Sequence, residues 1–214
     1  MKTISFLSQK GGSGKTTLSL HTAVAAGECG IATVVIDTDP QASASAWAQA
    51  RDKETPTVAA APAGNIKAVL DAAAGEGFAL AVIDAAPHLD PAVAQIAAAA
   101  DFIVIPVRPT PLDIQTARRA AAVARASGKP YGFVLNGCPA RAIEVPEALD
   151  ILAGLGGVVC PVTIGERRAY ARALGSGQAV TEFDARSKAS DEIRALWAWI
   201  DGRANVSARK GVKK

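Results

Sequence analysis

The chain has 214 residues, of which 50% are hydrophobic and 20% charged, and a formal net charge of +3 at pH 7. This length suits one α/β domain with a sizeable core, and the small net charge neither requires nor excludes a nucleic-acid partner. The sequence contains no signal peptide and no apolar stretch of the ~20 residues that a transmembrane helix needs. We expect one cytoplasmic domain over residues 1–203, followed by a basic and flexible tail over residues 204–214.

Short apolar segments alternate with alanine-rich helical patterns along most of the chain. The apolar segments predict strands at residues 3–7, 33–36, 57–60, 80–83, 102–107, 131–135 and 157–162. The patterns between them predict helices at residues 16–28, 41–52, 64–74, 91–98, 112–126 and 144–154, and helices alone follow at 165–174 and 187–202. Strands that are apolar throughout are typical of a parallel sheet covered on both faces. The sequence therefore predicts a doubly wound α/β fold, with a mostly parallel sheet and helices on both faces.

A glycine-rich loop connects the first predicted strand to the first predicted helix. It comprises Lys10, Gly11, Gly12, Ser13, Gly14, Lys15, Thr16 and Thr17. Residues without a Cβ allow backbone N–H groups to point at a phosphate, and the helix N-terminus adds further donors. We expect this loop to bind ATP, with Lys15 neutralising the β and γ phosphates and Thr16 coordinating Mg²⁺. The loop departs from the common P-loop pattern at its first position, which is Gln9 rather than glycine, and a flexible turn is the alternative interpretation.

Acidic residues end two of the predicted strands. Asp37 and Asp39 follow the second predicted strand, and Asp84 follows the fourth. Carboxylates at the ends of parallel strands lie near a phosphate loop, where Mg²⁺ and an attacking water need acidic partners. We expect Asp84 to hold Mg²⁺ through a water molecule, and Asp37 to support either the water shell of the metal or Lys15. Each aspartate taken alone also suits a helix cap or a turn.

Several stretches of the sequence resemble one family of P-loop ATPases. The string KGGSGKTT resembles the deviant Walker A motif of the ParA/MinD family, which has a second lysine at the position of Lys10. The resemblance extends over nearly the whole chain through the stretches VVIDTDPQAS, AVIDAAP, IPVRPTPLDI and GERRAYARALGSGQAVTEFD. It is closest to the small, ParF-like ParA proteins, because the phosphate loop begins by residue 9 and no helix-turn-helix precedes it.

The resemblance implies roles for individual residues. It implies that Lys10 reaches across a dimer interface to the nucleotide of the partner subunit, and that Asp39, in the DTDPQ stretch, positions the hydrolytic water. Lys10, Lys15 and Asp39 are thus the expected catalytic residues. Asn136 corresponds to an adenine contact of the family, although an Asn before a Gly is also a strong turn signal. The proline-rich stretch at 105–113 resembles a subunit-contact element of the ParF-like branch, and a stiff loop that leads into a helix explains it equally well.

The function that this resemblance implies is the ATP-dependent positioning of cell cargo. ATP and Mg²⁺ close a sandwich homodimer, the dimer binds nucleoid DNA without sequence preference, and a ParB-like cargo adaptor stimulates slow hydrolysis and release. The cargo is a plasmid, a chromosome or another assembly, and the sequence does not identify it. For the DNA contact we expect basic residues in the C-terminal part of the chain, above all Arg186, Lys188, Arg194 and Arg203. Acidic residues alternate with these, so an ordinary solvated surface is the alternative.

Other functions remain open. A MinD-like membrane-associated ATPase would use an amphipathic terminal helix, but the apolar residues at 196–200 precede a polar, basic tail and suit docking on the core, so we expect no stable membrane association. A small-molecule kinase or ATP-dependent ligase would use the same phosphate loop but seldom needs Lys10. A metal-cluster scaffold is disfavoured, because the three cysteines lack paired spacing. His88, which follows the AVIDAAP stretch, is a candidate sensor of nucleotide state, in competition with an ordinary surface role.

Overall fold

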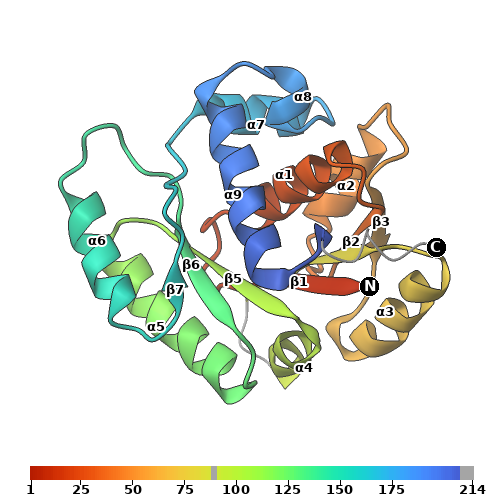
Figure 1. Cartoon of the computed structure of the whole chain (residues 1–214), viewed down its shortest axis with the longest axis horizontal. Coiled ribbons are helices and arrows are strands. Elements are labelled where there is room, and N and C mark those ends of the chain that lie inside the picture. Colours follow the sequence, from red (N-terminus) through yellow and green to blue (C-terminus); the bar gives the residue numbers. More distant parts are fainter. Residues whose placement is uncertain (88–90, 208–214) are drawn as a thin grey trace.

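A sheet of seven parallel strands forms the centre of the computed structural model, which describes residues 1–87 and 91–207 (Figure 1). The strands lie in the order β3-β2-β4-β1-β5-β6-β7. Their bounds are Lys2–Phe6 (β1), Thr33–Asp37 (β2), Thr57–Ala60 (β3), Leu80–Asp84 (β4), Phe102–Val107 (β5), Tyr131–Leu135 (β6) and Val158–Val159 (β7). Every pair of neighbouring strands is parallel, so the predicted α/β fold is confirmed. His88 and residues 208–214 of the expected tail lie outside the described residues.

Helices cover both faces of this sheet. One layer contains α1 (Lys15–Glu28), α2 (Ser43–Gln49), α7 (Arg168–Gly175), α8 (Val180–Phe183) and α9 (Lys188–Ala204). The other contains the 3₁₀ turn η1 (Ala63–Asn65), α3 (Ile66–Gly75), α4 (Pro91–Ala99), α5 (Pro111–Ala126) and α6 (Glu144–Ala153). Figure 1 shows the first layer above the sheet and the second below it.

Alternate residues of each strand serve the two layers. In β4, for example, Leu80 and Val82 pack in the α1 and α9 core, whereas Ala81 and Ile83 pack in the α4 and α5 core. Successive side chains of a strand point to opposite faces, and both faces are covered here. This double burial explains why the strands are apolar at nearly every position.

The structure differs from the predicted elements mainly at their ends. The strand predicted at 157–162 reduces to β7, because it pairs only with β6 at the edge of the sheet and Pro161 cannot donate a ladder hydrogen bond. The helix predicted at 41–52 begins only at Ser43, because Ala42 adopts a left-handed φ of 52°. The short helix α8 was not predicted. Its signal is Glu182, whose carboxylate accepts a hydrogen bond from the Ala179 backbone N–H at the start of the helix.

The last helix continues past the expected domain boundary. α9 ends at Ala204, and Val206 is buried in the core beside α1. Leu196, Trp197 and Ile200 of α9 are buried in the same core, so its apolar side is docked on the domain. Among the described residues, no helix is both long enough and apolar enough to span a membrane.

Candidate functional site

The glycine-rich loop lies between the end of β1 and the start of α1, at the carboxyl edge of the sheet (Figure 1). Gly14 is the N-cap of α1 and has a φ of 99°, a left-handed conformation that favours glycine. A Cβ on this residue would lie 2.0 Å from Nδ2 of Asn136, so the close approach also requires glycine. Asn136 follows β6 and donates a hydrogen bond of 2.8 Å to the carbonyl of Ser13. The loop backbone is therefore fixed at the N-terminus of α1, a position that suits a phosphate.

Lys15 is a buried cation in this loop. The residue is 6% exposed, and Nζ has one hydrogen bond within the described chain, of 3.5 Å to the carbonyl of Lys10. Burial lowers the pKa of Lys15, and the charges of Asp84 and Asp39 oppose that shift. A buried ammonium without a close counter-ion is costly, and a bound phosphate would remove that cost.

Asp84 is a buried carboxylate on the same edge, at the end of β4. It is 1% exposed, and neither oxygen accepts a hydrogen bond of normal geometry from any residue that the structure describes. Burial raises the pKa of Asp84 to about 7, an effect that the nearby Thr16 side chain opposes. An unsatisfied carboxylate beside a threonine hydroxyl fits a hydrated Mg²⁺ that also binds phosphate oxygens, because Mg²⁺ prefers oxygen ligands and retains water. The described residues contain no cluster of three or more His, Cys, Asp or Glu that would hold a metal alone.

Asp37 lies beside Asp84, since the two residues are register partners in β2 and β4. Its carboxylate anchors the segment that follows β2. One oxygen accepts a hydrogen bond from the Asp39 backbone N–H at 3.1 Å, and the other accepts bonds from the backbone N–H and the hydroxyl of Ser45 at 3.0 and 3.1 Å. In this structure Asp37 thus positions Asp39 and the start of α2. Its predicted support of the metal's water shell or of Lys15 stays a prediction.

Lys10 forms an ion pair that the sequence analysis did not anticipate. Its Nζ lies 2.7 Å from Oδ2 of Asp113, which is in the first turn of α5. The Lys10 side chain is 40% exposed, whereas that of Asp113 is only 3% exposed. Thr110, the N-cap of α5, donates its hydroxyl to the same carboxylate oxygen. The second lysine of the loop is therefore held within its own subunit. The T-x-x-D spacing from Thr110 to Asp113 was the available signal, but it predicts a helix cap rather than a lysine partner.

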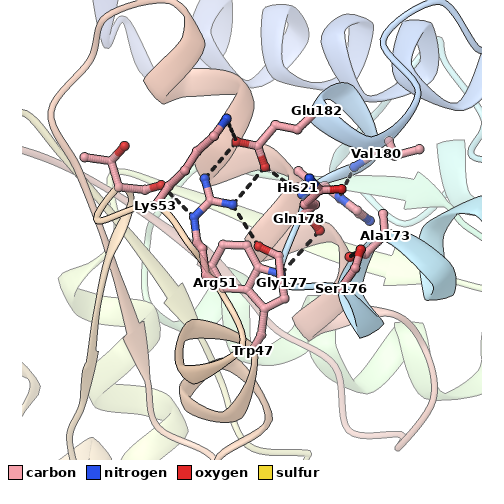
Figure 2. A network of polar contacts seen from close by, with 12 residues as sticks. His21, Trp47, Arg51, Lys53, Ala173, Ser176, Gly177, Gln178, Val180 and Glu182 are labelled. Atoms are coloured by element: carbon pink, nitrogen blue, oxygen red, sulfur yellow. Dashed lines mark hydrogen bonds and ion pairs between the residues drawn. The ribbon is translucent and has the colours of Figure 1, made fainter.

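A second network fixes the far end of α2 (Figure 2). Arg51 makes two bonds of 2.8 Å to the carboxylate of Glu182, and Lys53 adds a third of 2.8 Å. Burial alone would raise the pKa of Glu182, but Arg51 and Lys53 lower it to about 2. Nearby, His21 of α1 is fully buried and accepts a hydrogen bond of 3.1 Å from the backbone N–H of Val180. The segment after Asp39 is thereby attached to α1 and α8.

A cavity of about 540 Å³ lies between the loop that follows β6 and the start of α9. Cys138, Pro139, Thr163 and Glu166 line it. Burial raises the pKa of the Cys138 thiol to about 11, so this lining residue carries no charge at neutral pH. Asn136 lies two residues before Cys138 in the sequence, and the volume of the cavity suits a nucleoside. Here Asn136 itself is engaged with the loop, and its adenine contact stays a prediction.

The four predicted DNA-binding residues are exposed but are not gathered at one point. Arg186 and Lys188 lie at the start of α9, and Arg203 lies in its last turn, roughly 22 Å further along the helix at 1.5 Å per residue. Arg194 donates a hydrogen bond of 2.8 Å to the carbonyl of Ala185 and lies 3.5 Å from Asp191. Arg186, Lys188 and Arg194 therefore form one exposed group, from which Arg203 is separate.

Comparisons with known proteins agree with this geometry. Residues 4–180 match the family model described as the CobQ/CobB/MinD/ParA nucleotide binding domain. The chain is 31% identical, over 202 residues, to the maintenance of carboxysome distribution protein A of Gloeobacter kilaueensis, and the match covers 91% of this chain and 89% of that protein. The fold is similar to that of the septum site-determining protein MinD of Pyrococcus horikoshii, solved with Mg-ADP (TM-score 0.79, 18% identity, 94% of this chain and 96% of that one). It is also similar to a ParA family ATPase of Chlorobium tepidum (TM-score 0.72, 17% identity, 92% and 98% covered). The chain therefore belongs to the CobQ/CobB/MinD/ParA family of nucleotide-binding proteins.

Proposed function

We propose that this protein is an ATPase that positions or partitions cargo by cycling between a monomer and an ATP-bound homodimer. The observation that carries the proposal is the pair of lysines in one phosphate loop. Lys15 is buried and has no ion-pair partner among the described residues, and Lys10 is held at the rim of the loop by Asp113. Lys15 supports binding of a phosphate within the subunit, and Lys10, whose side chain is 40% exposed, reaches a nucleotide outside it only after leaving Asp113. Our assignment to the ParF-like branch rests on the sequence resemblance.

The proposed hydrolysis uses charge placement and needs no covalent intermediate. Lys15 neutralises the β and γ phosphates, and the backbone donors of the loop orient them. Thr16 and Asp84 would hold Mg²⁺, which supplies charge neutralisation at the phosphates. Asp39, half-buried and placed by its hydrogen bond to Asp37, orients the attacking water. Anchoring of α2 at both ends supports this role, because it limits the movement of the segment that carries Asp39.

The proposed dimer requires Lys10 to exchange partners. In the structure Lys10 binds Asp113 of its own subunit at 2.7 Å. In the dimer its ammonium leaves this carboxylate for the phosphates of the nucleotide in the other subunit. ATP carries one phosphate group more than ADP, and thus more negative charge, so ATP favours the exchange more than ADP does. The dimer then dissociates after hydrolysis.

Non-specific DNA is the proposed surface on which the dimer is retained, and a separate adaptor protein is the proposed stimulator of hydrolysis. The names of two similar proteins, one for carboxysome distribution and one for septum site determination, support a positioning role. Arg186, Lys188 and Arg194 supply an exposed basic group, which dimerisation doubles. A MinD-like membrane role is less favoured, because the apolar side of α9 is buried in the core. A kinase or ligase remains the second enzymatic candidate.

DNA retention in different nucleotide states tests this function. Duplex DNA should bind with ATP or a non-hydrolysable analogue and not with ADP, and its affinity should fall with salt at a log–log slope of about −0.9 per phosphate contact. Combined replacement of Arg186, Lys188 and Arg194 by alanine should abolish retention, whereas alanine at Lys67 and Arg119, exposed on the other helical layer, should not. Equal binding in all nucleotide states would remove DNA from the mechanism. Turnover that responds to a metabolite instead of DNA would favour the kinase or ligase.

A further inference from the structure

Large apolar side chains are exposed around one groove at the nucleotide edge of the domain. The exposed large apolar residues within the described chain are Leu112 (68%), Ile143 (77%), Ile151 (40%) and Phe183 (36%). Ile151 lines a groove between α5 and α6, and Leu112 and Ile143 each adjoin a residue that lines it. Figure 1 shows these two helices side by side, at the β6 and β7 end of the lower layer. Large apolar side chains exposed in and near a groove are typical of interaction sites.

The groove combines an apolar floor with an acidic rim. Its volume is about 260 Å³, and its apolar lining consists of Pro109, Pro111, Ile114, Ala148 and Ile151. Glu144 and Glu147 of α6 form one rim, and Arg118 and Gln115 of α5 form the other. Both glutamates are exposed, and neither has an ion-pair partner within the described part of the chain. The α6 rim therefore presents two unpaired negative charges beside an apolar slot.

We propose that this groove binds an apolar, positively charged segment of the adaptor protein that controls hydrolysis. The inference rests on the proposed function, in which such an adaptor exists. The floor accepts one or two large apolar side chains, and Glu144 and Glu147 attract lysine or arginine on the α6 side, whereas Arg118 disfavours a positive charge on the α5 side. A second copy of this chain is the competing occupant, and sedimentation distinguishes it from a separate partner.

The position of the groove connects it to the nucleotide site. Pro109 and Pro111 line the groove and flank Thr110, whose hydroxyl binds the Asp113 carboxylate that holds Lys10. A segment seated against these prolines touches the same turn that positions Asp113. Binding in the groove therefore affects the position of Asp113 and, through it, the ion pair that Lys10 must leave. An adaptor that controls hydrolysis requires such a coupling between its binding site and the nucleotide site.

Binding of a synthetic peptide tests the groove directly. The probe is a labelled peptide of about four helical turns, with leucine on one face and lysine on the other, and its control carries glutamate in place of lysine. By fluorescence anisotropy with the nucleotide-free full chain, the lysine peptide should bind at least about tenfold more tightly than the glutamate peptide. Ile151→Ser and Glu147→Gln should each weaken it by about fivefold. Phe183→Ser and Glu76→Gln, exposed outside the groove, are the matched controls and should leave affinity unchanged.

Methyl NMR supplies the location. The isoleucine methyl signals of Ile114, Ile143 and Ile151 should shift on addition of the lysine peptide, whereas those of Ile31 and Ile193, in the core beneath the other layer, should not.

Equal affinity for both peptides, or equal losses in the groove and control variants, would overturn the inference. A change in the monomer–dimer equilibrium of Ile151→Ser by sedimentation would overturn it too, by making the groove an interface between copies. Basal ATP hydrolysis is measured separately. If the protein binds the peptide but hydrolyses no ATP, the groove is supported and the proposed function is refuted. If it hydrolyses ATP but does not bind the peptide, the groove is refuted and the proposed function is supported.

Discussion

Asp113→Asn should make ATP-dependent dimerisation easier, because it releases Lys10. The substitution removes the charge that holds the lysine at 2.7 Å and keeps the shape of the side chain. Thr110 remains the N-cap of α5, because its hydroxyl oxygen accepts a hydrogen bond from the backbone N–H of residue 113. This bond does not depend on the side chain of residue 113. The fold should therefore survive the change.

The size of the effect follows from the exposure of the two partners. Exposed ion pairs contribute up to about 1 kcal/mol, and hydrogen bonds to buried charged groups about 1.5–3 kcal/mol. The buried Asp113 and the 40% exposed Lys10 lie between these cases. About 1.4 kcal/mol corresponds to a tenfold preference for the paired state. Because each subunit must release one lysine, the dimer association constant should rise by about tenfold per subunit, or about a hundredfold.

Sedimentation with a non-hydrolysable ATP analogue measures this constant. Asp101→Asn is the matched control, because it removes another lysine–aspartate pair, Lys2 with Asp101 at 3.1 Å, and Asp101 lies just before β5 at the opposite edge of the sheet. The control should leave dimerisation unchanged. An unchanged or weaker dimer in Asp113→Asn, or an equal gain in Asp101→Asn, would refute the idea that Asp113 restrains Lys10.

Three further predictions concern the phosphate site and the core. Lys15→Ala should abolish nucleotide binding, because the phosphates lose their buried counter-charge, and calorimetric titration with unchanged affinity would contradict this. Asp39→Ala should bind ATP but lose at least about a hundredfold in the rate of phosphate release, since the water loses its positioning group; turnover at the wild-type rate would exclude that role. Burial lowers the pKa of His21 to about 3, so the folded state favours neutral histidine. Its contribution to stability is then complete above the usual pKa of 6.5 and is lost as the pH falls, by about 2 kcal/mol at pH 5. Urea unfolding between pH 7 and 5 should show this slope for the wild-type protein and not for His21→Leu.

Local patterns in the sequence determined the fold class and the phosphate loop. Strands buried on both faces are apolar at nearly every position, and such strands in alternation with helices indicate a parallel sheet. The Gly14-Lys15-Thr16 string must lie at a helix N-terminus after a strand, because only that geometry aligns backbone donors on a phosphate. Asp84 could be recognised for a similar reason, since it ends such a strand. These features depend on neighbouring residues alone. The predicted ends that were wrong are the start of the helix at 41–52, where one residue is left-handed, and the extent of the strand at 157–162, which lies at the edge of the sheet.

Only the tertiary structure decided which distant residues meet. The ion pair of Lys10 and Asp113 joins positions 103 apart, and the hydrogen bond from Asn136 to Ser13 joins positions 123 apart. Both contacts exist because β1 lies beside β5, and β5 beside β6, an order that hydrophobic periodicity does not specify. The same packing joined Asp37 to Ser45 and formed the groove between α5 and α6. Periodicity identifies which face of an element is buried, but the partner of each polar side chain depends on how the elements are ordered in the sheet.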